Sequence, residues 1–171
     1  KITSCKTIQL ACERSLAELQ HSDDAPDSEW IFNDKAAEHF LQFCTFVFHV
    51  KGELAGKPFM LEPWQNYFVS QIYGWRRRTN SKERRYREVL LEVGRKNGKS
   101  FLCSTMALYE LLFGDSGAEI YSVATKVDQA KIVWESAGRM AKVMDPRLAG
   151  KLAQTVSAIT CEERFSTFKP L

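Results

Sequence analysis

Hydrophobic positions recur with a helical period along much of the chain. In the first of these stretches, residues 4–20, Ile8, Ala11, Cys12, Leu16 and Leu19 fall on one side of a helix. The same period predicts three more helices, at about residues 34–49, 61–75 and 126–144. Pro63 suits the first turn of the third helix, where a missing N–H costs nothing.

Short apolar runs predict strands in the second half of the chain. Glu88–Val93 (EVLLEV) and residues 118–125 (AEIYSVAT) have the length of buried strands, and Ser100–Phe113 between them is apolar nearly all round, as in a helix buried behind a sheet. Gly114 falls where a helix C-cap is expected. The order strand, loop, helix, strand, helix predicts an α/β fold with a mainly parallel sheet and helices on both faces.

The loop between the first strand and the buried helix, VGRKNGKS (Val93–Ser100), carries the candidate chemistry. Backbone N–H groups of such a loop, together with a helix N-terminus, present positive charge to a phosphate. Lys99 would reach the terminal phosphates, and the Ser100 hydroxyl would bind Mg²⁺. The phosphate-loop pattern G-x-x-x-x-G-K-[ST] requires glycine at 93, where this chain has valine, and Gly94 follows one residue late. The residues alone therefore leave a solvated basic turn open as an alternative.

Composition narrows the class of protein only a little. A chain of 171 residues with 44% hydrophobic and 26% charged residues can form a sizeable core. It contains no run of 18 apolar residues, so no membrane span is predicted. The five cysteines are scattered and the three histidines lack metal-ligand spacing, which favours reduced thiols over disulfides or a zinc site. A net charge of +3 does not by itself indicate a nucleic-acid partner.

Residues 76–87 (RRRTNSKERRYR) hold seven basic residues in twelve. One interpretation is contact with DNA phosphates. The other, which we favour, is a solvated connector ahead of the first strand, because charge runs usually mark exposed loops.

Several segments in order resemble the N-terminal ATPase region of the terminase large subunit, the motor that packages DNA into tailed bacteriophage heads. They are ACERSLAEL, KGELAGKPFMLEPWQ, GRKNGKS, YSVATKVDQAKIVWESA and STFKPL, and they span nearly the whole chain. Phosphate loops of this family drop the first glycine and carry basic residues instead, so the valine at position 93 fits the resemblance. The segment ATKVDQA resembles a motif of related translocases that couples nucleotide state to DNA.

The resemblance implies roles for individual residues. Gln65 would hold the adenine ring, since an amide offers one donor and one acceptor. Arg95 would stabilise the γ-phosphate and, with Lys99, would be catalytic. Gly94, Lys96, Asn97 and Gly98 would contribute backbone N–H groups, and Ser100 the metal ligand. The alternatives are that Trp64 is a core residue with Gln65 on the surface, and that Arg95 pairs with a carboxylate or lies in solvent.

The resemblance also implies that the chain has three parts and that it is a fragment of a larger DNA-packaging motor. Residues 1–75 would form a helical region with the adenine-binding segment, 76–87 a basic connector, and 88–171 the front part of a P-loop NTPase-like core. The acidic strand that hydrolysis needs is not apparent, since its only candidate, VSAITCEE (156–163), has Glu162 where aspartate is expected and is predicted to be a turn between two strands. No acidic nuclease cluster is present either. We therefore expect a fragment that binds ATP and Mg²⁺ but is hydrolytically incomplete.

The expected partners and location follow from the same resemblance. The partners are double-stranded DNA, a small terminase subunit, a portal ring and, at full length, further copies of the chain. The expected location is the host cytoplasm, transiently at the procapsid, with no membrane. The alternatives are another P-loop ATPase, helicase-like or a kinase, and a non-catalytic module that binds DNA or a protein partner.

Overall fold

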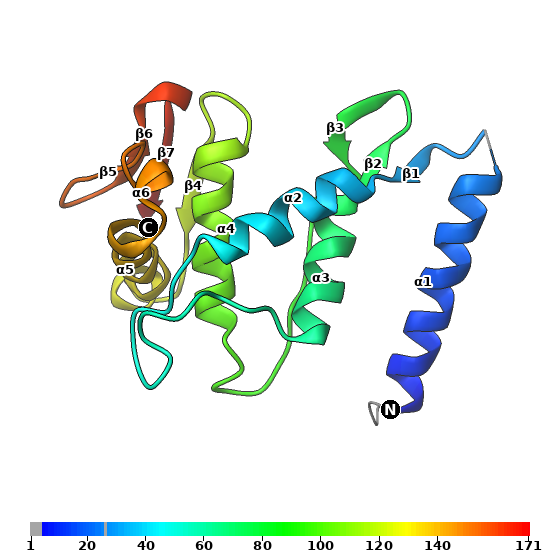
Figure 1. The fold of residues 1–171 in the computed structure, drawn as a ribbon, viewed down its shortest axis with the longest axis horizontal. Helices are drawn as coiled ribbons and strands as arrows, with labels where there is room; N and C mark the ends of the chain where they lie inside the picture. Colours follow the sequence, from blue (N-terminus) through cyan, green and yellow to red (C-terminus); the bar gives the residue numbers. More distant parts are fainter. Residues whose placement is uncertain (1–4, 26) are drawn as a thin grey trace. The chain divides into compact units, whose positions relative to one another are not determined.

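The computed structural model describes residues 5–25 and 27–171, which form an α/β structure. The chain divides into two compact units (Figure 1). The first joins the residues up to Leu41 with Glu62–Leu90, and the second joins Gln42–Leu61 with Leu91–Leu171. Each unit is described by itself.

The first unit combines helices with a small antiparallel sheet. Its elements are α1 (Lys6–Asp24), β1 (Trp30–Phe32), most of α2 (Asp34–Thr45), α3 (Pro63–Gly74), β2 (Trp75–Arg77) and β3 (Asn80–Arg84). The strand order is β1-β2-β3, with Phe32 opposite Trp75. The helices predicted at 4–20, 34–49 and 61–75 are confirmed, and Pro63 occupies the first turn of α3.

Aromatic side chains form the core of the first unit. Phe40 of α2 stacks on Tyr73 of α3 with ring centroids 4.3 Å apart, and Phe32 meets Trp75 edge-on at 5.6 Å. Gly74 lies against Phe32 so closely that a Cβ there would come within 2.3 Å of the ring. The absence of a side chain at position 74 is what lets the strand β1 approach the end of α3.

Helix α1 follows its predicted pattern only in part. Ile8 and Leu16, expected on its buried side, are 54% and 60% exposed. Its buried residues are serines instead: the Ser15 hydroxyl lies 2.7 Å from the Tyr67 hydroxyl, and Ser22 is 2% exposed. Both serines lie on the predicted side, where Ala11, Cys12 and Leu19 are half-buried, so the apolar period identified the packed side but not the small polar residues that make its closest contacts.

The second unit holds a four-stranded sheet covered by two helices. Its elements are α4 (Lys99–Phe113), β4 (Glu119–Ser122), α5 (Val127–Val143), α6 (Pro146–Ala149), β5 (Ala153–Gln154), β6 (Ile159–Cys161), the 3₁₀ turn η1 (Glu162–Arg164) and β7 (Ser166–Pro170). The strand order is β4-β7-β6-β5, in which β4 and β7 are parallel and the other pairs antiparallel.

The prediction of a mainly parallel sheet is thus not confirmed, because the two sheets are antiparallel and mixed. The chain supplies β5, β6 and β7 in succession with only a few residues between them. Such short connections can join antiparallel strands only, since parallel strands need a long crossover.

The predicted strand at Glu88–Val93 is wrong. This segment pairs with no strand among the described residues, and Val89 and Leu90 are 48% and 89% exposed. An apolar run has side chains suited to a strand, but a strand also needs a neighbouring strand whose backbone can hydrogen-bond to its own N–H and C=O groups. The strand predicted at 118–125 and the helix at 126–144 are confirmed as β4 and α5.

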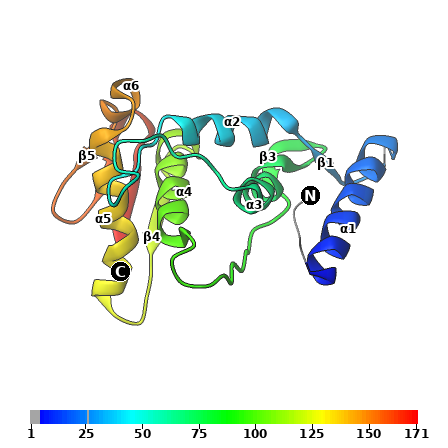
Figure 2. The ribbon, with the colours of Figure 1, turned by 60° about the horizontal axis from the view of Figure 1, so that its bottom comes forward.

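Helices α4 and α5 pack directly on each other (Figure 2). The Ser104 hydroxyl lies 2.7 Å from the carbonyl of Ser100 and 2.8 Å from that of Val133, so one small side chain joins the two backbones. Ser166 of β7 donates to the carbonyl of Leu111, which fixes the sheet to α4. Gly114 ends α4 as predicted, and a Cβ there would lie 2.4 Å from the Glu110 carbonyl oxygen.

Gly74→Ala should lower the free energy of unfolding by about 1–3 kcal/mol, because the added methyl group overpacks the Phe32 ring. Gly150→Ala is the matched control, since the nearest atom to its Cβ is the Pro146 carbonyl oxygen at 3.3 Å. Urea denaturation measures both. Equal stability of the two variants would contradict the close packing at Gly74.

Candidate nucleotide-binding site

The loop before α4 has an unusual backbone. Lys96 has φ 66° and Gly98, the N-cap residue of α4, has φ 73°, so two residues are left-handed. Glycine adopts this conformation freely, whereas a lysine is uncommon there and strained. Left-handed residues among right-handed ones turn successive N–H groups to one side, which makes a concavity suited to anions.

The side chain of Lys99 turns back over this loop. Its ammonium donates to the carbonyl oxygens of Val93 at 2.5 Å and Gly94 at 2.8 Å. Asn97 makes a further hydrogen bond within the loop, in which its Nδ2 donates to the Gly94 carbonyl oxygen at 3.2 Å. The positive charge is thereby held at the loop by two neutral acceptors that a charged ligand could replace.

Two further residues of the loop, Arg95 and Ser100, face solvent. Arg95 is exposed and makes no ion pair with any of the described residues. The alternative that it pairs with a carboxylate is therefore not observed among them. Ser100 is exposed in the first turn of α4 and lines a cavity of about 300 Å³ together with His49, Lys51, Phe101 and Arg139. An exposed hydroxyl at a helix start is a hard oxygen ligand that fits Mg²⁺, which prefers oxygen and keeps several waters.

His49 is a residue of this region that the sequence did not indicate. Its ring stacks on Phe101 at 4.6 Å and meets Phe59 edge-on at 5.7 Å. Burial lowers the pKa of His49, so the ring is a neutral packing group at neutral pH. It ties the loop between α2 and α3 to the first turn of α4.

Gln65 lies in the first unit and is 4% exposed, so it is not a surface residue as the alternative supposed. Its Oε1 accepts the backbone N–H of Glu62 at 2.9 Å, which caps the start of α3. The spacing Glu62-x-x-Gln65 is the signal for this cap. Trp64 is half-buried.

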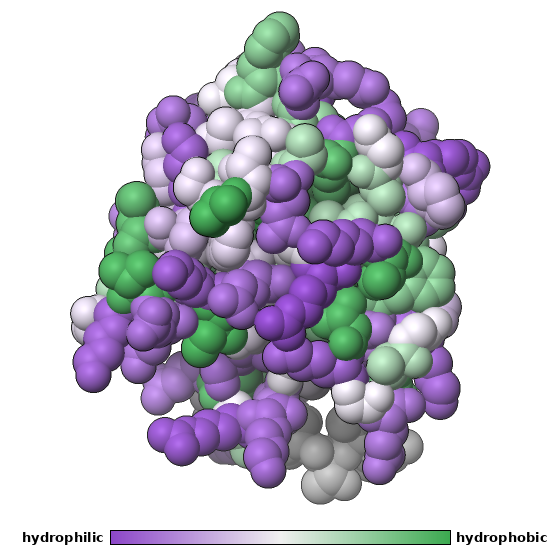
Figure 3. All heavy atoms as spheres, turned by 90° about the vertical axis from the view of Figure 1, so that its left-hand side faces the viewer, coloured by the Kyte–Doolittle hydropathy of each residue, from purple (hydrophilic) through white to green (hydrophobic). Residues whose placement is uncertain are grey.

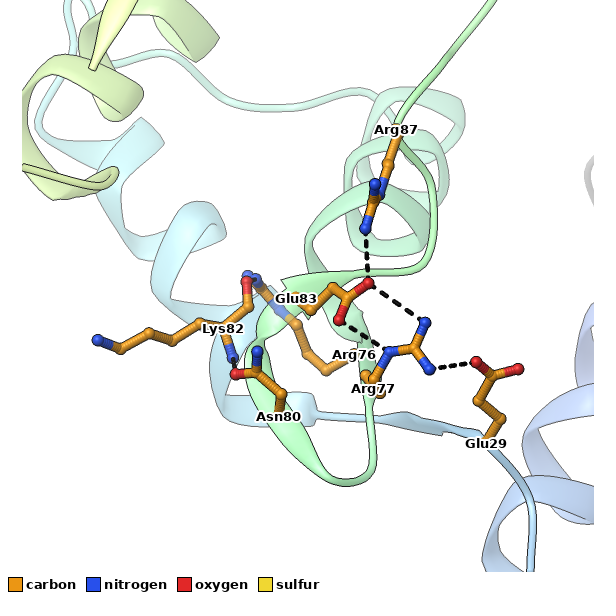
Figure 4. A network of polar contacts seen from close by, with 7 residues as sticks. All are labelled: Glu29, Arg76, Arg77, Asn80, Lys82, Glu83 and Arg87. Atoms are coloured by element: carbon orange, nitrogen blue, oxygen red, sulfur yellow. Dashed lines mark hydrogen bonds and ion pairs between the residues drawn. The ribbon is translucent and has the colours of Figure 1, made fainter. Parts of the chain in front are cut away.

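The basic run 76–87 forms much of the hairpin β2–β3, and its arginines bind the protein itself. Figure 4 shows Arg77 between two carboxylates: it pairs with Glu29 and, at 2.8 Å, with Glu83. Arg87 reaches the same Glu83 at 2.6 Å. The hydrogen bond from Arg77 is the main cause that lowers the pKa of Glu83.

The other arginines of the run hold backbone carbonyls and aromatic rings. Arg78 donates to the carbonyls of Ser22, Ser28 and Ala25, at 2.7, 2.9 and 3.3 Å. Arg85 pairs with Glu18 and lies over Trp75, and Arg84 lies over Tyr73. The side chain of Lys82 is the one cation of the run without a partner among the residues described. The run therefore braces α1 and β1 against the hairpin instead of offering a row of unengaged charges.

Residues 5–25 and 27–171 contain no disulfide, no metal-binding cluster and no membrane-spanning helix. The five cysteines are unbridged, and burial raises the pKa of Cys44 to about 12. No group of three His, Cys, Asp or Glu side chains there could hold a metal ion. No helix in that part of the chain is long and apolar enough to cross a membrane.

Comparisons with known proteins define the class to which this loop and fold belong. The family model of the terminase large subunit, ATPase domain, matches residues 63–169. This range is more than half of the chain and includes the loop and both helices around it, so the chain belongs to the terminase large-subunit ATPase-domain family.

A solved structure agrees with this assignment. The large terminase of bacteriophage HK97 superposes with a TM-score of 0.65 at 26% sequence identity, over 79% of this chain. The matched part is 27% of the HK97 protein, so this chain spans about a quarter of the length of that relative. No curated protein sequence matches the chain.

Arg78→Ala should lower the free energy of unfolding by about 0.5–1.5 kcal/mol, because its hydrogen bonds to three largely exposed carbonyls are lost. Lys82→Ala, the matched control, should change it by less than about 0.5 kcal/mol. Denaturation and a DNA-binding assay would be run on both. An Arg78→Ala chain of unchanged stability and weakened DNA binding would instead mark the run as a DNA contact.

Proposed function

We propose that the loop Val93–Ser100 binds the phosphates of ATP, and that the chain is the nucleotide-binding portion of a terminase large subunit. The observation that supports this is the Lys99 ammonium, which lies over the loop on the carbonyl oxygens of Val93 and Gly94. The family match supports the same conclusion, because its range includes this loop.

When ATP binds, groups of the loop would form hydrogen bonds to its phosphates in place of those they make in the free chain. The N–H groups of Gly94, Arg95, Lys96, Asn97 and Gly98 receive the phosphate oxygens, with the N-terminus of α4 behind them. Lys99 leaves the carbonyls of Val93 and Gly94 and contacts the terminal phosphates, which are stronger acceptors. Mg²⁺, bound by the Ser100 hydroxyl and phosphate oxygens, would neutralise phosphate charge there.

Arg95 is the proposed partner of the γ-phosphate. It is an exposed residue of the loop and has no carboxylate partner among the described residues. A guanidinium remains charged at all relevant pH values, and its planar fork matches phosphate oxygens. In this role Arg95 and Lys99 stabilise the charge that develops during phosphoryl transfer.

Gln65 is the proposed adenine contact, and its cap limits what it can offer. Its Oε1 already accepts one bond from Glu62, which leaves the Nε2 donor and a second lone pair. These remaining groups match the N7 acceptor and N6 donor of adenine. The bond to Glu62 also fixes the amide orientation, so the donor would be pre-positioned.

We infer the domain division 1–75, 76–87 and 88–171, with the loop part of a parallel P-loop core that has helices on both faces. ATP hydrolysis would require an acidic strand beyond the elements described above, and would drive double-stranded DNA into a procapsid in the host cytoplasm. A small terminase subunit, a portal ring and further copies of the chain are the proposed protein partners.

Lys99→Ala should weaken ATP binding at least about tenfold, because a hydrogen bond to a charged group contributes about 1.5–3 kcal/mol. Lys131→Ala, an exposed lysine of α5 outside the loop, is the matched control and should bind as the wild type does. Isothermal titration measures both affinities. If Lys99→Ala binds ATP as tightly as the control, the loop is not the phosphate site.

Gln65→Ala should have two separable effects. The loss of the cap should lower the free energy of unfolding by about 0.5–2 kcal/mol whatever the ligand. If Gln65 also reads the base, the variant should lose its preference for ATP over GTP. Thermal denaturation and competition binding measure the two effects. A destabilised variant with an unchanged preference would leave Gln65 as a cap alone.

A further inference from the structure

Helix α5 has an outer side that carries long polar side chains and an inner side of small residues. Figure 3 looks onto the side of the second unit where α5 lies and shows hydrophobic side chains separated by long hydrophilic ones. The buried side of α5 carries Ala130, Ala137 and Ala141. Because the distance between packed helices depends on the side chains at their contact, small residues let the backbone of α5 come close to that of α4.

Where the two helices meet, the Ser104 hydroxyl lies between two backbone carbonyl oxygens. The oxygen of Ser100, in the first turn of α4, is 2.7 Å away, and that of Val133, in α5, is 2.8 Å away. Ser104 is fully buried, so water does not compete for either contact. A serine hydroxyl has a single hydrogen to donate, and here both carbonyls share it. One side chain therefore ties the first turn of α4 to α5.

The residue whose carbonyl is held in this way, Ser100, is also the residue proposed to bind Mg²⁺. Its hydroxyl is exposed and makes no hydrogen bond with any of the described residues. The position of the backbone and one side-chain torsion, χ1, together determine where the hydroxyl oxygen lies. A contact that fixes the Ser100 backbone therefore determines the point from which this hydroxyl reaches toward a metal.

The two ligand-binding side chains of the first turn differ in how much displacement they tolerate. Mg²⁺ demands near-ideal octahedral geometry with bonds of about 2.0–2.1 Å, so even a small shift of Ser100 weakens its bond to the metal. Lys99 carries its ammonium on a flexible four-carbon stem, so the charge can follow a phosphate after the same shift. A displaced first turn should thus weaken metal binding more than phosphate binding.

Thr105, the next residue along α4, offers a comparison within the same helix. Its hydroxyl is also buried and donates to a carbonyl one turn back, that of Phe101, at 3.0 Å. Toward α5 it meets the Met140 sulfur at 4.0 Å, a weak acceptor, instead of a backbone oxygen. Phe101 is a packing residue that stacks on His49. Thr105 thus matches Ser104 in burial and in its local hydrogen bond, but the residue that it holds is not a proposed ligand.

We propose that Ser104 is a positioning residue for Mg²⁺ at the nucleotide site. By joining the Ser100 carbonyl to the Val133 carbonyl, its hydroxyl holds the first turn of α4 in place relative to α5 and so presents the Ser100 hydroxyl to the metal. Ser104 contacts neither ATP nor the metal and acts through Ser100. This inference rests on the nucleotide binding proposed for the loop Val93–Ser100.

Isothermal titration of the full chain with ATP, in Mg²⁺ and in EDTA, tests this role. The ratio of the two affinities measures how much the metal tightens ATP binding. Ser104→Ala removes the hydroxyl, and Ser104→Cys keeps a side chain of similar size with only a weak donor. Each should lower the ratio at least about fivefold, because small misplacements of a binding group cost large factors. The affinity in EDTA should change less than about twofold, because Lys99 remains and tolerates the shift.

Thr105→Val is the matched control, since it removes a buried hydroxyl of α4 and keeps the shape of the side chain. It should lower the melting temperature, as the Ser104 variants do, but leave the ratio of affinities at the wild-type value. A ratio that is unchanged in both Ser104 variants, or that falls equally in Thr105→Val, overturns the role of Ser104 alone.

The wild-type titrations separate this inference from the proposals on which it rests. A wild type that binds ATP equally well in Mg²⁺ and in EDTA overturns the metal role of Ser100 and, with it, the positioning role of Ser104. A wild type that binds no ATP under either condition overturns the proposed function together with this inference.

Discussion

Helix α4 has to bury almost its whole length and still leave its first turn open. Leu102, Leu108 and Leu111 are fully buried, whereas Ser100, two residues from Leu102, is exposed. The helix is apolar nearly all round, so it is stable only when α5, the sheet and the segment after α2 cover it together. The packed neighbours fix where the helix starts, and that start positions the loop with Lys99 and Ser100.

The contacts around α4 use small polar side chains where the backbones come closest. Ser104 joins α4 to α5, and Ser166 joins the sheet to α4, each through a buried hydroxyl with a carbonyl partner. Replacing either partner alone would leave a buried polar group unsatisfied, which costs more than the bond itself contributes. In the first unit, arginines make the corresponding contacts between elements. They reach from the hairpin to α1 and β1, in place of an extensive apolar contact.

The sequence predicted the parts whose stability is local and missed those that depend on distant partners. Helices α2, α3 and α5 and the Gly114 cap follow from period and cap chemistry, and each was predicted within a few residues. The strand prediction for Glu88–Val93 is wrong because an apolar pattern shows that a segment could join a sheet. It does not show whether a neighbouring strand has a free edge to pair with. The charge run 76–87 predicts a solvated connector, because nothing in the spacing of its arginines reveals Glu18, Glu29 or the carbonyls near Ser22.

For the candidate site, the loop was identifiable from the sequence, but its state was not. The triplet Gly98-Lys99-Ser100 and the helix after it are local features, whereas the left-handed Lys96 and the carbonyl contacts of Lys99 are visible only in three dimensions. Gln65 illustrates the converse, since the resemblance suggested a role toward a base and the structure adds that its oxygen caps α3.

We propose that the loop before α4 is a phosphate cradle. The most direct test is a ¹H–¹⁵N spectrum of the isotopically labelled chain, titrated with Mg²⁺ and ATP. If the loop binds phosphate, the largest amide shifts will fall on Gly94–Ser100, with the N–H groups of the left-handed turn moving together. Amide shifts that avoid this loop, or a spectrum that ATP leaves unchanged, would show that the loop is not the phosphate site.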